Sequence, residues 1–297
     1  MSNNIPLVSI IVNCFNGEKY LKKCLESIID QKYQNWEIIF WDNISTDNSR
    51  KIVESYRDSR IKYFKSEEHV TLYSARNLAL KKISGEFVCF LDVDDWWTPD
   101  KISSQINFLN KNSNIDILYT NFFNYFEGRK NKKIFSKQAL PFGRITQNLL
   151  DHYKIGILTV MIKRSILQEN FFKENYEIIA DFDFFLKLSL QKNISVIQTP
   201  LAYYRIHSEN LSKKKLNQQI EEIEDWYNRN VDTKHFKDYS LKGVKLSMQI
   251  LRIKKYLMDG NKKNALMEIF QKPISLRKLK FLGFISFSKE NIKKILS

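Results

Sequence analysis

The 297-residue sequence predicts an α/β fold in which a mostly parallel sheet is flanked by helices, with a basic helical extension at the C-terminus. Apolar runs of strand length alternate with segments of helical period through the first third of the chain. The first run, at residues 7–15, is a continuous apolar run, which is typical of a strand buried on both faces. Helical patterns dominate from about residue 217. Such dense alternation favours parallel strands joined by helices.

The elements of the first half follow in order. The first strand is expected at residues 7–15, between Pro6 and Asn16-Gly17, and a helix with one apolar face follows it. Further strands are expected at residues 36–41, 60–64 and 86–91. Further helices are expected after Ser45 and Asp47 as caps, at residues 74–83 with Gly85 as C-cap, and from Thr98-Pro99-Asp100 with proline at its first position.

The second half is less regular. Strands are expected at residues 115–119 and 157–163, an extended segment at 194–206, and a helix at 183–191. Residues 127–143 are basic and rich in turn formers, so we expect a loop there. The predicted organisation is one α/β domain over residues 1–212 and a basic helical region over residues 213–297.

Charge and composition exclude several classes of protein. The net charge is +15, and residues 213–297 contribute +11 of it, with 20 Lys and Arg against 9 Asp and Glu. A basic surface attracts nucleic acid, anionic lipid or acidic glycan equally, so charge alone does not identify the partner. The sequence has no apolar run long enough to span a bilayer, no secretory signal and three cysteines without CxxC spacing. We therefore expect a cytoplasmic protein.

Polar residues follow three of the expected strands, at residues 14–18, 42–47 and 92–95. Ligands bind beyond the carboxyl ends of parallel strands, so these segments should share one rim of the sheet. The run Asp92-Val93-Asp94-Asp95 suits Mg²⁺ or Mn²⁺ together with substrate phosphates, and its alternative is a cap for the helix near Pro99. No glycine-rich phosphate loop is present, so Arg76 is the candidate for phosphate binding, with an exposed helix arginine as the alternative.

Two strings carry a resemblance to a known family. VSIIVNCFNGEKYLKKCLESIIDQKYQNWEIIFWDNISTDNS and SARNLALKKISGEFVCFLDVDDWWTPDKI resemble the opening of family 2 glycosyltransferases, which have the Rossmann-like GT-A fold. The likeness is close over residues 6–120 and weaker to residue 212. It implies an inverting enzyme that moves a sugar from a nucleoside-diphosphate sugar, of the UDP type, to a hydroxyl of a glycan or lipid-linked glycan. It also implies Mg²⁺ or Mn²⁺ as cofactor and a role in lipopolysaccharide or other bacterial surface-polysaccharide biosynthesis.

The resemblance carries over position by position. It implies contacts with the donor nucleotide at Asn13, Phe15, Asn16, Glu18, Asp42, Arg76 and Asp92. It implies Asp94 as metal ligand, and His207, in Tyr203-Tyr204-Arg205-Ile206-His207, as a second ligand. Asp181, in Ala180-Asp181-Phe182-Asp183, is implied as the catalytic base, with a helix N-cap as the alternative. Ala180 departs from the family pattern, which places an acid there, and this puts a supporting contact in doubt.

Other functions stay open at this point. A nucleotidyltransferase would need a triphosphate-binding signature, and a catalytically impaired relative could act as a binding or scaffold subunit. Nucleic acid is not expected as a partner, because basic and aromatic residues are not interleaved as in a nucleic-acid platform. We expect the basic C-terminal region to contact an anionic membrane at the inner leaflet, as a peripheral protein. Its alternative is a solvated helical bundle that packs on the catalytic domain or on another subunit.

Overall fold

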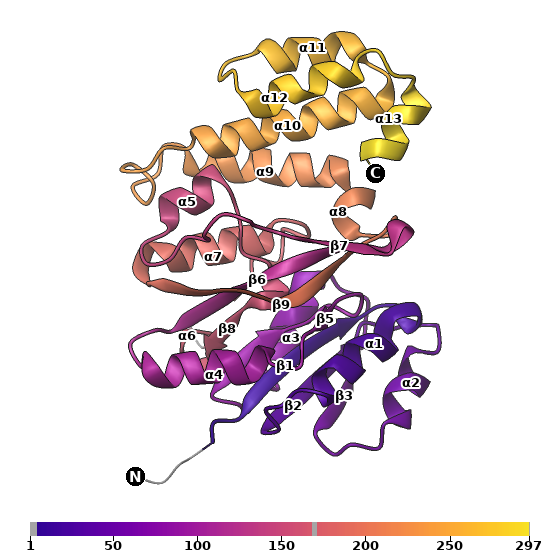
Figure 1. Ribbon diagram of the computed structural model, residues 1–297, viewed down its shortest axis with the longest axis vertical. Coiled ribbons are helices and arrows are strands. Elements are labelled where there is room, and N and C mark those ends of the chain that lie inside the picture. Colours follow the sequence, from indigo (N-terminus) through magenta and orange to yellow (C-terminus); the bar gives the residue numbers. More distant parts are fainter. Residues whose placement is uncertain (1–4, 168–170, 297) are drawn as a thin grey trace. The chain divides into compact units, whose positions relative to one another are not determined.

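The computed structural model describes residues 5–167 and 171–296, which form two compact units (Figure 1). The first unit comprises Met1–Ile145 and Lys154–His207, and the second comprises Thr146–Tyr153 and Ser208–Ser297. The first unit is α/β and the second is helical, so the predicted fold class is confirmed. The functional boundary after residue 212 stays a prediction.

Four parallel strands form the first part of a nine-stranded sheet, in the order β3-β2-β1-β4. They are β1 (Val8–Cys14), β2 (Trp36–Asp42), β3 (Ile61–Lys65) and β4 (Phe87–Phe90). The helices that connect them are α1 (Glu18–Ile29), α2 (Ser49–Ser55) and α3 (Leu72–Leu80). Every residue of β1, β2 and β4 is buried, which explains why apolar residues occupy both faces of these strands.

The second part of the sheet is mixed. From β4 the order continues β8-β6-β9-β5, in which β8 is antiparallel to β4 and β6, whereas β6 and β9 are parallel. The strands are β5 (Trp96–Trp97), β6 (Ile117–Phe126), β7 (Asn131–Ile134), β8 (Met161–Lys163) and β9 (Ile194–Ile206). The helices are α4 (Lys101–Lys111), η1 (Glu127–Arg129), η2 (Ile157–Thr159), α6 (Arg164–Leu167) and α7 (Ala180–Gln191).

The predicted loop at residues 127–143 is wrong in its first half. Residues of η1 and β7 lie there, and β7 pairs with β6 as an antiparallel hairpin. The strand is exposed along most of its length, so it has no apolar alternation that could have revealed it. The strand expected at 157–163 likewise begins with the short helix η2.

Two helix ends also differ from expectation. Helix α3 ends at Leu80 with Lys81 as its C-cap, so Gly85 caps nothing. Gly85 instead lies against β1, where a β-carbon would stand 2.6 Å from the backbone nitrogen of Ser9. Helix α4 begins only at Lys101, because residues 98–100 form a preceding turn in which the Lys101 amide bonds the Thr98 carbonyl. Pro99 is therefore outside the helix.

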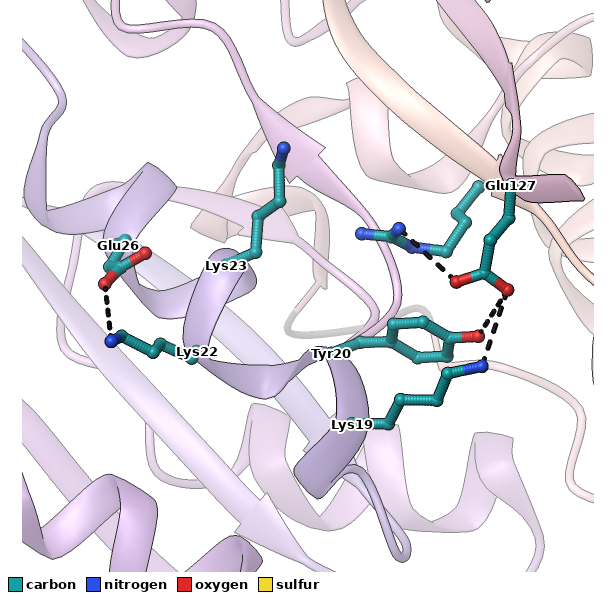
Figure 2. Close-up of a pocket in the computed structure, with 7 residues that line it drawn as sticks. Lys19, Tyr20, Lys22, Lys23, Glu26 and Glu127 are labelled. Atoms are coloured by element: carbon teal, nitrogen blue, oxygen red, sulfur yellow. Dashed lines mark hydrogen bonds and ion pairs between the residues drawn. The ribbon is translucent and has the colours of Figure 1, made fainter. Parts of the chain in front are cut away.

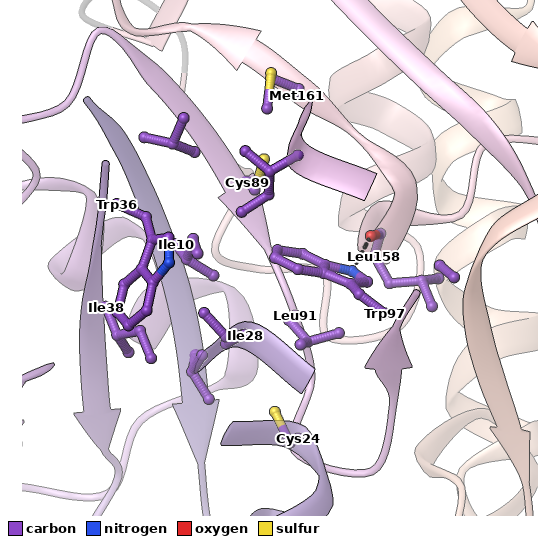
Figure 3. Close-up of a cluster of buried hydrophobic side chains, with 14 of the residues drawn as sticks. Ile10, Cys24, Ile28, Trp36, Ile38, Cys89, Leu91, Trp97, Leu158 and Met161 are labelled. Carbon is purple, nitrogen blue, oxygen red and sulfur yellow. Dashed lines mark hydrogen bonds between the residues drawn. The ribbon is translucent and has the colours of Figure 1, made fainter. Parts of the chain in front are cut away.

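The main core lies between the sheet and the helices that cover it (Figure 3). Strand residues Ile10 and Ile38 pack there with Cys24 and Ile28 of α1. The Trp97 indole nitrogen donates to the Leu158 carbonyl over 2.8 Å, which satisfies its polar group inside the core. The three cysteines are buried as free thiols, as their spacing predicts. This packing holds the start of α1 at the carboxyl end of β1.

The second unit is helical, in agreement with the periodicity of the sequence. Its elements are α5 (Thr146–Asp151), α8 (Leu211–Lys214), α9 (Leu216–Asn230), α10 (Lys242–Asp259), α11 (Lys262–Phe270), α12 (Leu276–Leu279), η3 (Lys280–Phe284) and α13 (Lys289–Leu296). Helix α10 is central and contacts α5, α9, α11 and α13. Within residues 5–167 and 171–296, no helix has both the length and the apolar character needed to span a bilayer.

Candidate active site

The turn between β1 and α1 carries four of the predicted nucleotide contacts. Asn13 is buried, and its side-chain nitrogen has no hydrogen-bond partner among the residues that the structure describes. Phe15 is half exposed, with its ring edge-on to His69 at 4.6 Å between centroids. A β-carbon at Gly17 would lie 3.0 Å from Val93 Cγ2, so this turn approaches the Asp92–Asp95 loop closely. The end of β1 thus holds a buried amide nitrogen without a partner among the described residues, and the turn after it carries an exposed ring.

The loop after β2 holds this turn in place. Asn16 adopts a left-handed backbone, which asparagine tolerates, and its Oδ1 accepts from the Thr46 amide over 2.8 Å. Glu18 Oε2 accepts from the backbone and side-chain nitrogens of Asn48, over 2.8 and 2.9 Å. Asp47 accepts from the Glu18 amide over 2.9 Å and also bonds the Ser49 amide. The Glu18 carboxylate is therefore engaged in joining the two loops.

Asp42 ends β2 and is almost completely buried. Its Oδ1 accepts from the Ser45 amide over 2.7 Å and its Oδ2 from the Tyr63 hydroxyl over 2.5 Å. Burial and the neighbouring Asp42 raise the pKa of Tyr63. The phenol therefore stays protonated and donates a hydrogen bond to the carboxylate. This arrangement fixes the loop that carries Ser45.

Arg76 lies on α3 with only 1% of its surface exposed. The alternative of an exposed helix arginine is therefore wrong. Its Nη2 is 2.5 Å from Asp92 Oδ1, and its guanidinium lies over the Tyr73 ring at 4.7 Å. Although burial opposes the charge, Asp92 raises the pKa of Arg76 above its ordinary value. The pair Arg76–Asp92 is thus a fixed ion pair at the end of β4.

Asp94 and Asp95 have their partners at the end of β9, on Arg205 and on His207, the residue after the strand. Asp94 Oδ2 lies 2.9 Å from His207 Nε2, and the Arg205 Nε donates to the Asp94 carbonyl over 2.7 Å. Asp95 is buried and accepts from the Arg205 amide over 2.8 Å. Burial, Asp94 and Asp92 raise the pKa of Asp95 well above its usual range. The helix-cap alternative is wrong for both aspartates, because the N-cap of α4 is Asp100.

These side chains fit a hard divalent cation that is completed by substrate. Among the residues that the structure describes, no three His, Cys, Asp or Glu side chains form a ready metal cage. Mg²⁺ seldom has such a cage, because it binds one or two protein ligands together with phosphates and water. Adjacent ligands of an octahedral ion with bonds of about 2.1 Å are about 3 Å apart, close to the 2.9 Å between Asp94 Oδ2 and His207 Nε2. The crowded carboxylates also gain from a cation.

Asp181 lies in the first turn of α7, whose N-cap is Ile179, so the N-cap alternative is wrong. Burial is the main cause that raises the pKa of Tyr73, and the charge of Asp181 is the second. The same charge also helps to raise the pKa of Arg76. Asp181 is therefore near the Arg76–Asp92 pair, although 105 residues separate it from Arg76 in the sequence. Ala180 is fully buried, so the acid that the family pattern places there would also be buried.

Three further residues surround the metal candidates and were not predicted. The Tyr20 hydroxyl donates to Glu127 over 2.9 Å (Figure 2). Arg205 Nη1 lies 3.8 Å from the same carboxylate. The Tyr20 and His207 rings are 5.0 Å apart. Tyr20, Glu127 and Arg205 border a hollow of about 490 Å³, whose other lining residues are Lys19, Lys22, Lys23 and Glu26. A charged residue inside the apolar run of β9 was the available signal for Arg205.

Comparison of the sequence with known families and proteins bears on this site. The model of Glycosyl transferase family 2 matches residues 9–171. The chain is 36% identical, over 71% of its length and 82% of the relative's, to UDP-Glc:alpha-D-GlcNAc-diphosphoundecaprenol beta-1,3-glucosyltransferase WfgD of Escherichia coli. It is 34% identical, over 55% of its length and 65% of the relative's, to the putative teichuronic acid biosynthesis glycosyltransferase TuaG of Bacillus subtilis.

Solved structures show the same fold at lower identity. S. aureus TarS 1-349 in complex with UDP-GlcNAc aligns with a TM-score of 0.59 and 19% identity, over 94% of this chain and 80% of the TarS 1-349 chain. The mannosyltransferase PcManGT from Pyrobaculum calidifontis, in complex with GDP-Man and Mn²⁺, aligns with a TM-score of 0.59 and 16% identity, over 94% and 79% of the two chains.

Proposed function

The chain belongs to glycosyl transferase family 2 and is a glycosyltransferase with the GT-A fold, and on that premise we propose its reaction. It transfers a sugar from a nucleoside-diphosphate sugar to a hydroxyl of a lipid-linked glycan, with inversion at the anomeric carbon. The observation that carries the proposal is the pair Asp94–His207 beside the ion pair Arg76–Asp92, both at the carboxyl end of β4.

The donor diphosphate is assigned to this rim. Asp94 and His207 would hold Mg²⁺ or Mn²⁺, which would offset the negative charge of the departing diphosphate. Arg76 supplies a permanent positive charge, and its partner Asp92 keeps the guanidinium in one orientation. Asn13, Phe15 and Asn16 border the nucleoside side of the rim. Asp42 and Glu18 shape that side through the loop contacts of their carboxylates.

Asp181 is assigned as the base of a single displacement. Its carboxylate takes the proton of an acceptor hydroxyl as that oxygen forms a bond to the anomeric carbon. The bond between that carbon and the diphosphate oxygen breaks at the same time, on the opposite face, and the electron pair leaves with the nucleoside diphosphate. This geometry inverts the anomeric configuration. The nearness of Asp181 to Arg76 supports its place beside the donor.

The relatives suggest the substrates. The name of the E. coli relative contains UDP-Glc as donor and GlcNAc-diphosphoundecaprenol as acceptor, and that of the B. subtilis relative contains teichuronic acid biosynthesis. We extend these chemistries to this chain as a UDP-sugar donor and an acceptor linked to a membrane lipid, in surface-polysaccharide biosynthesis. Such an acceptor places the enzyme at the inner face of the cytoplasmic membrane.

Calorimetric titration tests the donor site. UDP, GDP and dTDP are each titrated with and without Mn²⁺ into the wild type and Asp94→Ala. We expect Mn²⁺-dependent binding of UDP that Asp94→Ala loses. Asp100→Ala, which alters a half-exposed carboxylate paired with Lys32, should keep it. Absence of binding by every nucleotide would contradict the proposed reaction. A transfer assay on a water-soluble acceptor that carries GlcNAc-diphosphate then tests the reaction itself, and the anomeric configuration of its product tests inversion.

A further inference from the structure

Exposed apolar side chains gather in one segment of the second unit. Among the described residues, six of the eleven large apolar side chains that are exposed lie between residues 267 and 287. They are Met267, Phe270, Ile274, Leu276, Leu282 and Phe287, and we call them the 267–287 surface. Leu276 is 79% exposed and Met267 is 65% exposed, so these side chains are not merely at the edge of a core. Apolar patches of this kind mark an interaction surface.

The segment is ordered by a separate set of apolar residues beneath it. On α11, Ala265 and Ile269 face a small core with Ile253 and Leu257 of α10. Met267 and Phe270, three residues apart on the same helix, share its exposed side. Phe281, Phe284 and Ile285 pack against the same core from η3 and the residue after it. Figure 1 shows α11 and α12 lying over α10, and both helices contact it.

The charges of residues 261–289 are almost all positive. Between residues 261 and 289 the sequence contains a single acidic residue, Glu268. Its side chain is 11% exposed and faces Arg252 at 3.7 Å, and burial raises its pKa. The exposed cations of the same stretch include Lys272, Arg277 and Lys280. A ligand of this surface therefore meets apolar groups and positive charge together.

We propose that the 267–287 surface docks the enzyme on an anionic lipid bilayer, with its apolar side chains among the acyl chains and its cations at the lipid headgroups. Apolar burial and attraction to anionic lipid act together in interfacial binding of this kind. A second copy of the chain is disfavoured as the occupant, because a symmetric dimer would bring the same cations face to face. The inference deepens the proposed function, since it rests on an acceptor that is anchored in a membrane.

Vesicle co-sedimentation of the full-length protein, without donor or acceptor, tests the docking surface. We expect binding to vesicles of phosphatidylcholine with phosphatidylglycerol, weakening as salt rises, and little binding to phosphatidylcholine alone. Phe270→Ser/Leu276→Ser should weaken binding at least tenfold, whereas Phe142→Ser, which alters an exposed phenylalanine of the first unit, should not. Lys272→Glu/Lys280→Glu should also weaken it, and Lys234→Glu/Lys237→Glu, with exposed lysines outside the surface, should do so less.

Three results would overturn the docking proposal. One is equal binding to neutral and anionic vesicles, and another is unchanged vesicle binding by Phe270→Ser/Leu276→Ser. The third is a dimer in sedimentation velocity that the same double variant dissociates, which would assign the surface to a second copy. The proposed reaction is read separately, on the water-soluble acceptor. If the protein binds vesicles but transfers no sugar to the water-soluble acceptor, the proposed reaction is contradicted. If it transfers sugar to that acceptor but binds no vesicles, the docking proposal is contradicted.

Discussion

Asp94 and His207 are 113 residues apart in the chain, yet Asp94 Oδ2 and His207 Nε2 stand 2.9 Å from each other. The contact joins the loop after β4 to the residue after β9, and Arg205 supports it with one bond to the Asp94 carbonyl and one to Asp95. The two ligand candidates are therefore held together before substrate arrives. Preorganisation of this kind lowers the cost of binding a cation between them.

The first prediction concerns this pair as metal ligands. We expect His207→Ala and Asp94→Asn each to lower the affinity for Mn²⁺ in the presence of UDP by about tenfold to hundredfold or more, because a donor atom is lost. Electron paramagnetic resonance of free Mn²⁺ measures this without reliance on turnover. His235→Ala, an exposed histidine of the second unit, is the matched control. Wild-type Mn²⁺ affinity in both variants would remove the pair from the metal site.

The second prediction concerns Asp181. We expect Asp181→Asn to reduce kcat by about 10²- to 10⁴-fold, the range over which a positioned base acts, while UDP affinity changes little. The matched control is Asp183→Asn, two residues further along α7, whose carboxylate is buried and paired with Lys187 at 2.7 Å. The transfer assay measures turnover and the nucleotide titration measures UDP affinity, so together they separate a role in catalysis from a role in donor binding. Near-normal turnover of Asp181→Asn would show that another group takes the proton.

The sequence predicts the part of the site that depends on strand ends. Strands β1, β2 and β4 can be predicted from the sequence because all their residues are buried. Their carboxyl ends place Asn13, Asp42 and Asp92 on one rim of the sheet. The sequence does not predict that Asp94 pairs with His207 whereas Asp95 accepts from the Arg205 amide. Those partners lie 110 and 113 residues away, at the end of a strand in the mixed part of the sheet, where strand order does not follow the chain.

Gly85 and β7 show why the remaining differences arose. A glycine shortly after a helical pattern is typical of a C-cap, but the structure requires Gly85 for a close approach to β1, a long-range packing effect. Most residues of β7 are exposed, so the strand lacks the alternation of apolar and polar residues that usually indicates a strand. It forms because its backbone pairs with β6. The bond from Tyr20 to Glu127 could not be predicted for the same reason, because Glu127 lies in η1, between the two strands of that hairpin.

The third prediction is a pH dependence of stability that comes from Glu37. This buried carboxylate accepts from Ser9 and Lys62, each over 2.5 Å, and from the amide and hydroxyl of Ser84 over 2.7 Å. Burial opposes its charge, but these bonds lower the pKa of Glu37 from 4.5 to about 2. A carboxyl with these two pKa values stabilises the folded state at neutral pH by at most about 3 kcal/mol.

The sign follows from the depressed pKa of Glu37 in the folded state. The stabilisation is fully present above pH 4.5 and is lost as the pH falls from there through about 2. Urea unfolding at about pH 6 and about pH 3 should therefore show that the wild type loses about 2 kcal/mol more than Glu37→Gln between the two conditions. Equal losses in the two proteins would mean that Glu37 titrates alike in the folded and unfolded chains.

The fourth prediction uses Gly85 to test the packing of the segment before β4 against β1. In Gly85→Ala the new β-carbon would lie 2.6 Å from the Ser9 nitrogen, 2.7 Å from the Leu7 carbonyl oxygen and 2.7 Å from the Ser9 hydroxyl. Two of these neighbours are backbone atoms of the β1 segment and cannot rotate away, so β1 or the residues before β4 must shift. Overpacking of this kind costs about 1–3 kcal/mol.

Gly128→Ala is the matched control, because a β-carbon there would have no heavy atom within 4 Å. Its expected effect is neutral or stabilising by up to about 1 kcal/mol, through reduced freedom of the unfolded chain. Because Gly85 precedes β4, a forced shift should also reach the Asp92–Asp95 loop, so we expect Gly85→Ala to weaken Mn²⁺-dependent UDP binding as well as stability. Thermal unfolding and UDP titration of both variants measure the two effects. A Gly85→Ala protein as stable as Gly128→Ala would mean that β1 and the β4 segment are not packed as closely as described.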